Sequence, residues 1–520
     1  MIKKCKRLLC GLLAGICTAA ALPAFSAGAE VIRTSLGQRG DLTQDGYIDI
    51  GDVIFLEQSL IYNGMQLELM MVNSPDGEQR SMAFYADLNA DGCVNALDLT
   101  LIKRAALGLY EPDIIYEESA DEDFIEAPIS QFYPSLRCQG TNTLLMLVVE
   151  FPDCKFTKSY TTEEIYQTSF GPGNPNDPAY PLESVIGYYE RASYGALTMN
   201  ADIYRYNARY NSTDYVYIDN GGNYWADATR LLDELMSDMD DEIDFTRYDV
   251  NRDGIMDTIL LSVADTTSDD GWWPCSGQYR GSKRFDGIQP GNIILGNTDP
   301  SDKIEYNSTW IHELGHGMGL PDYYKYKNAE DDWEGLHGQA GWEMMDDARF
   351  DMCAFSKLMY GWYKPAQIHV YTGGTQVYKL RSSQVEGNCI IIPRYDLNGY
   401  FSEYMVVEYA TIEGNNPNWW GSFGNGGIRV LHAEASSFGQ MFKYENYSKL
   451  YDESNNRQRV LRLANDAEGG GFFRTYDEID GSISGFHWYD RNGYQTVDTG
   501  IKITVGELVG GRYTVIISET

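Results

Sequence analysis

The segment Trp310–Asp322, WIHELGHGMGLPD, constrains the fold of this chain more than any other stretch. His312 and His316 are four residues apart, so a helix places both imidazoles on one face, where they can share a metal ion. Glu313 lies next to His312, in position to act on a metal-bound water rather than on the ion. Two hydroxyl residues are predicted to cap the start of this helix, Ser308 and Thr309. The alternative is a core helix that happens to carry two histidines.

The end of this helix supplies a third ligand. Gly319 permits a sharp exit and Pro321 prevents continuation, so the chain returns Asp322 toward the two histidines. Two imidazoles and one carboxylate, with a fourth position left for water, are typical of a catalytic zinc site. Four residues further along the chain are alternative third ligands: Glu330, Glu334, His337 and Glu343.

Composition excludes two classes of partner. The 520 residues include 76 acidic and 40 basic side chains, which gives a net charge of −36. A surface this negative repels nucleic-acid phosphates and anionic lipid, so neither is expected as a partner. The length predicts about three domains.

The N-terminal residues are predicted to be a secretory signal. Basic residues precede an apolar run over 8–25, and 27–29 offer an A-x-A cleavage site. We expect residues 1–29 to be removed, with Ser26 as the other cleavage candidate and an uncleaved membrane anchor as the alternative. The mature protein is then soluble and exported. Six widely spaced cysteines remain, which permit disulfides but are at least as consistent with buried thiols: Cys93, Cys138, Cys154, Cys275, Cys353 and Cys389.

Two copies of one acidic pattern predict calcium loops. A calcium ion takes six to eight oxygens, and alternate residues of a tight loop with glycine at its sixth position supply them. The first copy comprises Asp41, Thr43, Asp45, Asp49 and Asp52, and the second comprises Asp87, Asn89, Asp91, Asn95 and Asp98. A run with helical spacing follows each loop, over 53–60 and 99–107, so each unit is a loop with one helix.

This pair of units, over 36–109, resembles a dockerin, the calcium-dependent module that binds a cohesin on a cellulosome scaffold. The resemblance implies a secreted, cell-surface, cellulosome-associated protein with cohesin contacts from both copies: Ile50, Gly51, Glu57, Gln58, Ala96, Leu97, Lys103 and Arg104. The copies differ at every one of these positions, so we expect a single binding mode. Residues 63–80 are predicted to be an inserted loop. A calcium module that only stabilises the chain is the alternative.

Residues 110–134 contain eight acidic residues and no basic one, and prolines lie at 112, 128 and 134. Charge repulsion and proline predict an extended linker, with an inhibitory segment over the cleft as the alternative. We therefore expect a dockerin over 36–109, an acidic linker over 110–134, a catalytic domain over 135–370 and a β-rich domain over 371–520.

The expected catalytic domain begins with the apolar run 144–151, which predicts a strand buried on both faces. Helical patterns follow at 182–191 and 227–239, and a second apolar run lies at 259–263. An oxygen-rich turn before that run is interpreted as a third calcium turn, formed by Asp249, Asn251, Asp253 and Asp257. Its twelfth position is Leu260, so other residues would have to complete it, and a simple Asx turn is the alternative.

Several longer strings resemble the immune inhibitor A family of secreted zinc metallopeptidases. They are VIGYYERASYG at 185–195, IDFTRYDVNRDGIMD at 243–257, HELGHGMGLPDYY at 312–324, GWEMMD at 341–346, CAFSKLMYGWYKP at 353–365, EYMVVEY at 403–409 and GGIRVLH at 426–432. The resemblance implies an α/β zincin-like peptidase fold, with Met345 in a methionine turn beneath the metal. Three neighbours are candidates by proximity to stabilise an oxyanion, with a structural role as the alternative for each: Tyr323, Tyr324 and His337.

Beyond residue 365 the chain is expected to be β-rich. Short β-branched and aromatic runs separated by glycine turns predict strands at 376–380, 406–409, 428–431, 501–505 and 513–517. We expect a C-terminal β-sandwich. Trp419 and Trp420 are interpreted as core or interface residues, with stacking on sugar rings as the alternative.

The sequence therefore predicts a secreted zinc endopeptidase with structural calcium, tethered to a scaffold and acting on protein or peptide. Glu313 is the expected general base, and His312, His316 and Asp322 are the expected zinc ligands. The competing hypotheses are an inactive, scaffold-borne binding protein with a protease fold and a dockerin-bearing carbohydrate-active enzyme. The intact ligand set argues against the first, and the second lacks a paired-carboxylate motif.

Overall fold

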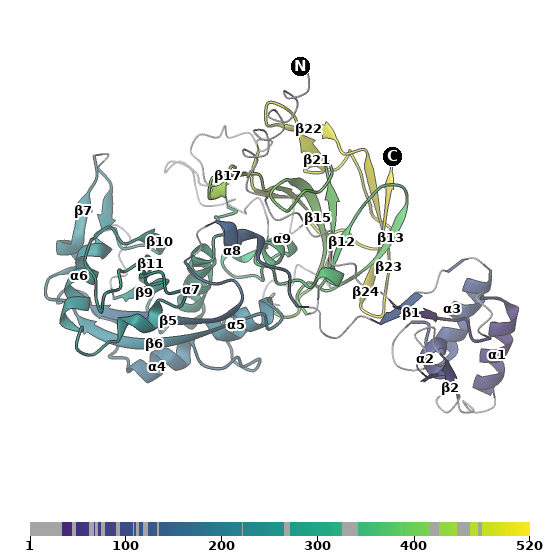
Figure 1. The fold of residues 1–520 in the computed structure, drawn as a ribbon, viewed down its shortest axis with the longest axis horizontal. Coiled ribbons are helices and arrows are strands. Elements are labelled where there is room, and N and C mark those ends of the chain that lie inside the picture. Colours follow the sequence, from purple (N-terminus) through teal and green to yellow (C-terminus); the bar gives the residue numbers. More distant parts are fainter. Residues whose placement is uncertain are drawn as a thin grey trace, which may run out of the picture.

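The computed structural model describes residues 34–43, 48–61, 67, 71–73, 79–89, 94–107, 109–110, 114–117, 123–132, 135–220, 222–264, 271–324, 342–385, 387–416, 426–444, 458–465 and 471–520. Some predictions fall outside this part of the chain: those on 1–29, Asp45, Asp91, Cys93, Glu330, Glu334, His337, Trp419 and Trp420. Figure 1 shows a small helical unit at one end, an α/β region at the other and a β-rich region between them. Across the described ranges, no helix has the length and apolar character needed to span a bilayer.

The N-terminal unit is built on two helices, α1 (Ile50–Ile61) and α3 (Ala96–Ala106). They belong to one buried cluster that contains Val53 and Leu56 of α1 together with Leu101 and Ile102 of α3. Each helix follows one of the two predicted calcium loops. The arrangement of a loop followed by one helix, repeated twice, is therefore present as predicted.

The segment between the two units is longer than a simple loop. It contains the antiparallel strands β2 (Met71–Asn73) and β3 (Gln79–Ser81), and the short helix α2 (Met82–Ala86) follows. The inserted loop predicted over 63–80 thus includes, among its described residues, an antiparallel strand pair.

The twelfth residue of each predicted calcium loop ties the loop to its helix. Asp98 accepts hydrogen bonds from the N–H groups of Leu88 at 2.8 Å and Asn95 at 2.9 Å. Asp52 accepts from the matching N–H groups of Leu42 at 2.8 Å and Asp49 at 2.9 Å, and both carboxylates are fully buried. The two copies therefore share one backbone design.

Both ends of the segment 110–134 lie against other elements. Strand β4 (Ile114–Glu117) pairs antiparallel with β1 (Thr34–Gln38). Further on, Ile129 is fully buried in the 3₁₀ turn Pro128–Gln131, and the N–H of Ile125 donates to the carbonyl of Tyr363 at 3.0 Å. The extended linker predicted over 110–134 is thus too long. Burial of its apolar residues outweighs the charge repulsion on which that prediction rested.

A five-stranded sheet forms the centre of the α/β region, in the order β10-β11-β9-β5-β6. Four strands are parallel, and β10 pairs antiparallel with β11 at one edge. The strands are β5 (Gly140–Glu150), β6 (Leu197–Asn207), β9 (Thr258–Val263), β10 (Cys275–Gln278) and β11 (Asn292–Gly296). The predicted strands 144–151 and 259–263 are confirmed as β5 and β9, and β5 is buried on both faces.

Helices cover both faces of this sheet. Leu144, Met146 and Val148 of β5 face a core shared with α5 (Val185–Ala192) and α7 (Lys303–Gly317). The alternate residues Leu145, Leu147 and Val149 face a second core shared with α6 (Ala228–Asp238). Helix α4 (Thr162–Ser169) contributes Ile165 to the first core. Because side chains alternate along β5, this one strand contributes to the cores on both faces of the sheet. Helix α7 lies on the face that carries Leu144, Met146 and Val148.

Two sheets of the C-terminal region share one buried cluster. One has the order β12-β14-β15-β16-β19 and the other the order β13-β24-β23-β20. The strands are β12 (Ile368–Val370), β13 (Gln376–Arg381), β14 (Cys389–Pro393), β15 (Glu403–Ala410), β16 (Gly427–Glu434), β19 (Leu461–Leu463), β20 (Glu478–Ile479), β23 (Ile501–Val509) and β24 (Arg512–Glu519). All five predicted strand segments lie in these strands. The assignment as a β-sandwich stays a prediction.

Short antiparallel pairs complete the described strands: β7 (Val216–Ile218) with β8 (Tyr224–Ala226), β17 (Ser437–Phe438) with β18 (Met441–Phe442), and β21 (His487–Tyr489) with β22 (Gln495–Asp498).

Replacing Asp98 by alanine tests the buried carboxylate that joins the second loop to α3. The substitution leaves the N–H groups of Leu88 and Asn95 without their partner, at a cost of about 1–3 kcal/mol. We expect faster amide hydrogen exchange over α3, measured by mass spectrometry on the full chain in EGTA. The matched control is Thr100→Ala, whose hydroxyl is exposed. Equal exchange in both variants would contradict the role of Asp98.

Candidate metal centre

The helix α7 begins earlier than the sequence predicts. Its N-cap is Asp302, whose side chain accepts from the N–H of Glu305 at 3.2 Å. Ser308 and Thr309 lie inside the helix, where their hydroxyls donate back to the carbonyl of Glu305 at 3.0 and 2.9 Å. The prediction of Ser308 or Thr309 as the N-cap is therefore wrong, because a hydroxyl can bond within a helix as well as cap one.

The helix exit returns the chain as predicted. Gly319 adopts a φ of +105°, a conformation that residues with a Cβ rarely reach. Pro321 follows, and the Oδ1 atom of Asp322 then lies 3.0 Å from Nε2 of His312 and 3.2 Å from Nε2 of His316. The structure thus brings all three predicted zinc ligands together at one point.

Backbone carbonyls orient both imidazole rings. Nδ1 of His312 lies 2.9 Å from the carbonyl of Met344, and Nδ1 of His316 lies 2.7 Å from the carbonyl of Leu320. A carbonyl can only accept, so each Nδ1 carries the proton and each Nε2 is left to face the ligand position. Neither carbonyl contact can be read from the side-chain sequence, because main-chain atoms carry no residue signature.

Glu313 completes the cluster. It is 6% exposed, and its Oε2 atom has no hydrogen-bond partner among the described residues. One ligand atom from each of His312, Glu313 and His316 lies within 4.8 Å of the others. A buried carboxylate oxygen without a partner is costly unless a further group binds there. The site therefore fits a divalent cation with a bound water, and the nitrogen and oxygen donors suit zinc.

The ionisable side chains of this site shift one another's pKa values. Burial lowers the pKa of His316, but the neighbouring Asp322 outweighs that effect and raises the pKa to about 9. His312 is also raised, and the imidazoles hold the pKa of Asp322 well below its usual range despite burial. Burial raises the pKa of Glu313. A raised pKa suits a group that must first accept a proton and then release it.

The segment after the ligands packs against α7. Met345, on the short helix α8 (Met344–Asp347), is fully buried with its sulfur against Gly315, where any larger residue would collide with it. Glu343 is committed elsewhere: it caps α8 and accepts from the N–H of Met345 and from the hydroxyl of Ser356 at 2.7 Å. It is therefore not placed as a third zinc ligand.

The oxyanion candidates differ in position. Tyr323 is fully buried, and its hydroxyl lies 3.1 Å from that of Ser356, so it does not face the ligand atoms. The Tyr324 ring stacks on His312 with centroids 6.2 Å apart. Cys275, on the edge strand β10, was not singled out from the sequence. Burial and then the charge of Glu313 raise the pKa of its thiol to about 12.

The third predicted calcium turn is closed by its own backbone. Asp249 accepts from the N–H groups of Asp253 at 3.0 Å and Gly254 at 2.9 Å, and Asp257 accepts from that of Val250 at 3.0 Å. Burial raises the pKa of Asp257 to about 6. Asn251 also accepts from the N–H of Asp253 at 3.0 Å, which is the two-residue contact of an Asx turn. The assignment to calcium stays a prediction.

The described residues of the two predicted calcium loops make hydrogen bonds within the loops, and their role as calcium ligands stays a prediction. Asn95 accepts from the N–H of Leu97 at 2.8 Å, Asp49 accepts from that of Gly51 at 2.6 Å, and the hydroxyl of Thr43 donates to Asp52 at 3.1 Å. Asp41, Asp87 and Asn89 also lie in the two loops. Four of the predicted thiols, Cys138, Cys275, Cys353 and Cys389, are free in the structure.

Comparison with known proteins identifies one of these units. Residues 39–107 match the family described as Dockerin type I domain, so this part of the chain is a type I dockerin domain. No curated protein matches the chain.

Among solved structures, wild-type OgpA from Akkermansia muciniphila is 16% identical, with 56% of this chain and 73% of that chain covered and a TM-score of 0.21. Catalytically inactive OgpA in complex with an O-glycopeptide, glycodrosocin, is 13% identical over the same shares, with a TM-score of 0.20. Similarity at this level carries no weight for fold or activity. The resemblance to immune inhibitor A is not shown by these comparisons and stays a prediction.

Zinc uptake by the metal-free protein should release protons near neutral pH. The pKa of His316 is raised to about 9, so its ring is protonated at pH 7 and must lose that proton to bind a metal. We expect about one proton or more released per zinc. Titration calorimetry in buffers of different ionisation enthalpy measures it. The release should shrink as the pH rises through about 9, and a binding heat independent of buffer at pH 7 would contradict it.

Proposed function

We propose that this protein is a zinc-dependent endopeptidase that its dockerin domain attaches to a cohesin-bearing scaffold outside the cell. The observation that carries the proposal is the meeting of the Asp322 carboxylate with Nε2 of His312 and of His316. These three residues would hold the zinc. The next residue after His312, Glu313, is buried beside them with an oxygen left over for water.

A bound zinc lowers the pKa of its water toward about 7 and polarises a peptide carbonyl. The remaining steps belong to side chains of this chain. Glu313 accepts the proton of the attacking water and passes it to the departing amine, serving as base and then as acid in one turnover. The carbonyls of Met344 and Leu320 hold the histidine rings with Nε2 toward the metal.

The same four residues support an active enzyme over an inactive relative. An inactive protein with this fold would be free to lose His312, Glu313, His316 or Asp322, yet all four are present and adjacent. The zincin-like fold, the methionine turn at Met345 and the immune inhibitor A relationship belong to this proposal. Met345 beneath α7 is the contact that supports the methionine turn.

The dockerin domain supplies the proposed location. Type I dockerins bind calcium and dock on cohesins, so we expect calcium in both loops and a cellulosome-associated, extracellular enzyme. Side chains at the predicted cohesin-contact positions include Ile50 and Leu97, which are 66% and 48% exposed. Lys103 and Glu57 pair across the two helices at 3.5 Å, so these contact positions from the two copies lie side by side. The signal peptide over 1–29 is part of the same proposal.

Replacing Glu313 by glutamine should abolish hydrolysis and leave zinc in place. The amide cannot take a proton from water, so casein or gelatin hydrolysis should fall by about 10²-fold or more. Metal analysis of the purified variant should still give a zinc content equal to that of the unmodified protein. Glu305→Gln is the matched control, because Glu305 lies on the same helix and is half-exposed. Full activity in Glu313→Gln, or activity that resists a zinc chelator, would remove the mechanism.

Cohesin binding should require calcium. A pull-down of the full chain with a panel of type I cohesins should succeed in calcium and fail in EGTA, because the predicted loops need the ion to hold their acidic residues together. Asp87→Ala and Asp41→Ala should weaken capture in calcium, each through one loop. Capture that is unchanged in EGTA would reject the calcium-dependent dockerin.

A further inference from the structure

The segment 342–357 lies beneath the metal centre and carries the carbonyl that orients a zinc ligand. Met344 accepts from Nδ1 of His312 at 2.9 Å, and Met345 packs against α7 at Gly315. The N–H of Tyr323, next to Asp322, donates to the carbonyl of Met345 at 2.8 Å. Any shift of this segment therefore moves two of the three ligands.

Groups from the C-terminal sheet hold both ends of this segment. Glu408 of β15 and Arg429 of β16 are paired residues on adjacent strands, and both are buried. Nη1 of Arg429 lies 3.3 Å from Oε1 of Glu408 and donates to the carbonyl of Trp342 at 3.0 Å. Oε2 of Glu408 accepts from the N–H of Ala354 at 2.8 Å. The Glu408–Arg429 pair thus holds the segment by hydrogen bonds at two points, just before α8 and at the start of helix α9 (Ala354–Met359).

Between these two points, Glu343 connects the first part of the segment to its last part by hydrogen bonds. Its carboxylate accepts from the N–H groups of Met345 and Cys353 and from the hydroxyl of Ser356. The residue is fully buried, and burial raises its pKa to about 7. The segment from Trp342 to Ser356 therefore behaves as one closed unit whose two ends are fixed from outside.

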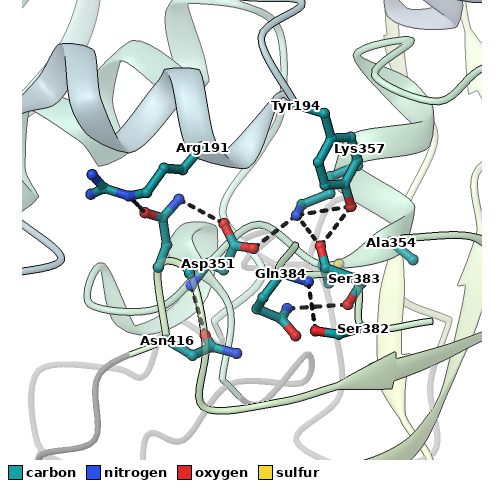
Figure 2. Close-up of polar contacts among 12 residues, drawn as sticks. Arg191, Tyr194, Asp351, Ala354, Lys357, Ser382, Ser383, Gln384 and Asn416 are labelled. Carbon is teal, nitrogen blue, oxygen red and sulfur yellow. Dashed lines mark hydrogen bonds and ion pairs between the residues drawn. The ribbon is translucent and has the colours of Figure 1, made fainter. Parts of the chain in front are cut away.

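A second buried ion pair, between Asp351 and Lys357, lies within this segment and is tied to residues beyond 370 (Figure 2). Nζ of Lys357 lies 2.8 Å from Oδ2 of Asp351 and also donates to the carbonyl of Ser383. Asp351 is held in turn by two residues beyond 370: Asn415 donates to its Oδ1 at 3.0 Å, and Asn416 accepts from its N–H at 3.0 Å. Asn415 also accepts from Nε of Arg191 on α5 at 2.7 Å. The C-terminal region and the α/β region are joined at this point.

Together these contacts lead from the C-terminal sheet to a zinc ligand in three steps. Arg429 and Glu408 fix the ends of the unit, Glu343 fixes its interior, and Met344 presents a carbonyl to His312. Partners that orient a metal-ligating imidazole typically change metal affinity about 10–100-fold when they are lost.

We propose that Arg429, paired with Glu408, is a positioning residue for the metal centre, and that the C-terminal β-rich region is part of the catalytic unit. The inference rests on the proposed zinc site. Arg429 acts through the peptide that carries Met344. The C-terminal region in this account is neither a substrate-binding appendage nor a spacer.

The test is the paired variant Glu408→Gln/Arg429→Met in the full chain. The amide of glutamine still accepts from the N–H of Ala354, and removing both charges leaves no unpaired buried ion. Zinc affinity, measured by competition with a chromophoric chelator, should fall about 10–100-fold. The visible spectrum of the cobalt(II)-loaded protein should also shift, because the His312 ring loses its fixed orientation.

The matched control is Glu403→Gln/Arg394→Met. This pair belongs to the same region, and it contacts His432 and Tyr489. We expect unchanged zinc affinity and an unchanged cobalt spectrum. Equal behaviour of the two paired variants, either both unchanged or both weakened, would overturn the positioning role.

A third variant covers the case in which the paired substitution does not fold. Arg429→Lys keeps the charge beside Glu408 but cannot hold Glu408 and the Trp342 carbonyl with one planar fork. It should fold cooperatively and bind zinc more weakly than the unmodified protein. Unmodified affinity in a folded Arg429→Lys would overturn the inference. If the unmodified protein binds neither zinc nor cobalt, the proposed function fails and the positioning role fails with it. If it binds both metals, the proposed zinc site stands and the variants alone decide whether Arg429 positions it.

Discussion

The structure depends on one carboxylate, that of Asp322, placed between two imidazoles. With neutral rings, Asp322 and Glu313 leave two negative charges at a site where the Asp322 side chain is 11% exposed and Glu313 is 6% exposed. An uncompensated buried charge is among the most costly features a protein can contain, so the pocket requires either protons on its histidines or a divalent cation. The pKa values of His312 and His316 are raised, which favours protons on the two histidines. The proposed zinc ion would provide the divalent cation, and its water would reach the Oε2 atom of Glu313, which has no hydrogen-bond partner among the described residues.

The rest of the fold keeps these groups at hydrogen-bonding distance. The parallel strands β9, β5 and β11 form a platform, and α7 lies in the core on one side of it. Two glycines make this geometry possible. Gly315 leaves room for the sulfur of Met345, and Gly319 adopts the positive φ that turns the chain back to Asp322. Hydrogen bonds between the segment 342–357 and residues beyond 370 then link the layer beneath the ligands to the C-terminal region. Regions that look separate along the sequence therefore share one polar network (Figure 2).

Sequence reasoning succeeds where spacing alone determines geometry. Four-residue spacing placed His312 and His316 on one helix face, the glycine and proline beyond them predicted the return of Asp322, and the repeated acidic pattern predicted two loop-and-helix units. The matched dockerin domain over 39–107 confirms the last of these. Apolar runs likewise predicted β5 and β9, because a strand buried on both faces needs no alternation.

Sequence reasoning fails where distant residues compete for the same group. Ser308 and Thr309 looked like caps, but Asp302 lies six residues before Ser308 and starts the helix earlier. The acidic segment 110–134 was predicted to be extended, but Ile129 within it is fully buried. The carbonyls of Met344 and Leu320 and the pair Glu408–Arg429 carry no local signal, since their roles exist only once the chain has folded.

X-ray anomalous scattering from crystals of the zinc-loaded mature protein tests the central claim most directly. Data collected on both sides of the zinc absorption edge locate the ion without any assumption about activity. We expect one strong difference peak in contact with Nε2 of His312, Nε2 of His316 and the carboxylate of Asp322, with Glu313 beside it and not among the ligands. A zinc peak elsewhere, or these three side chains in contact only with one another at full zinc loading, would contradict it.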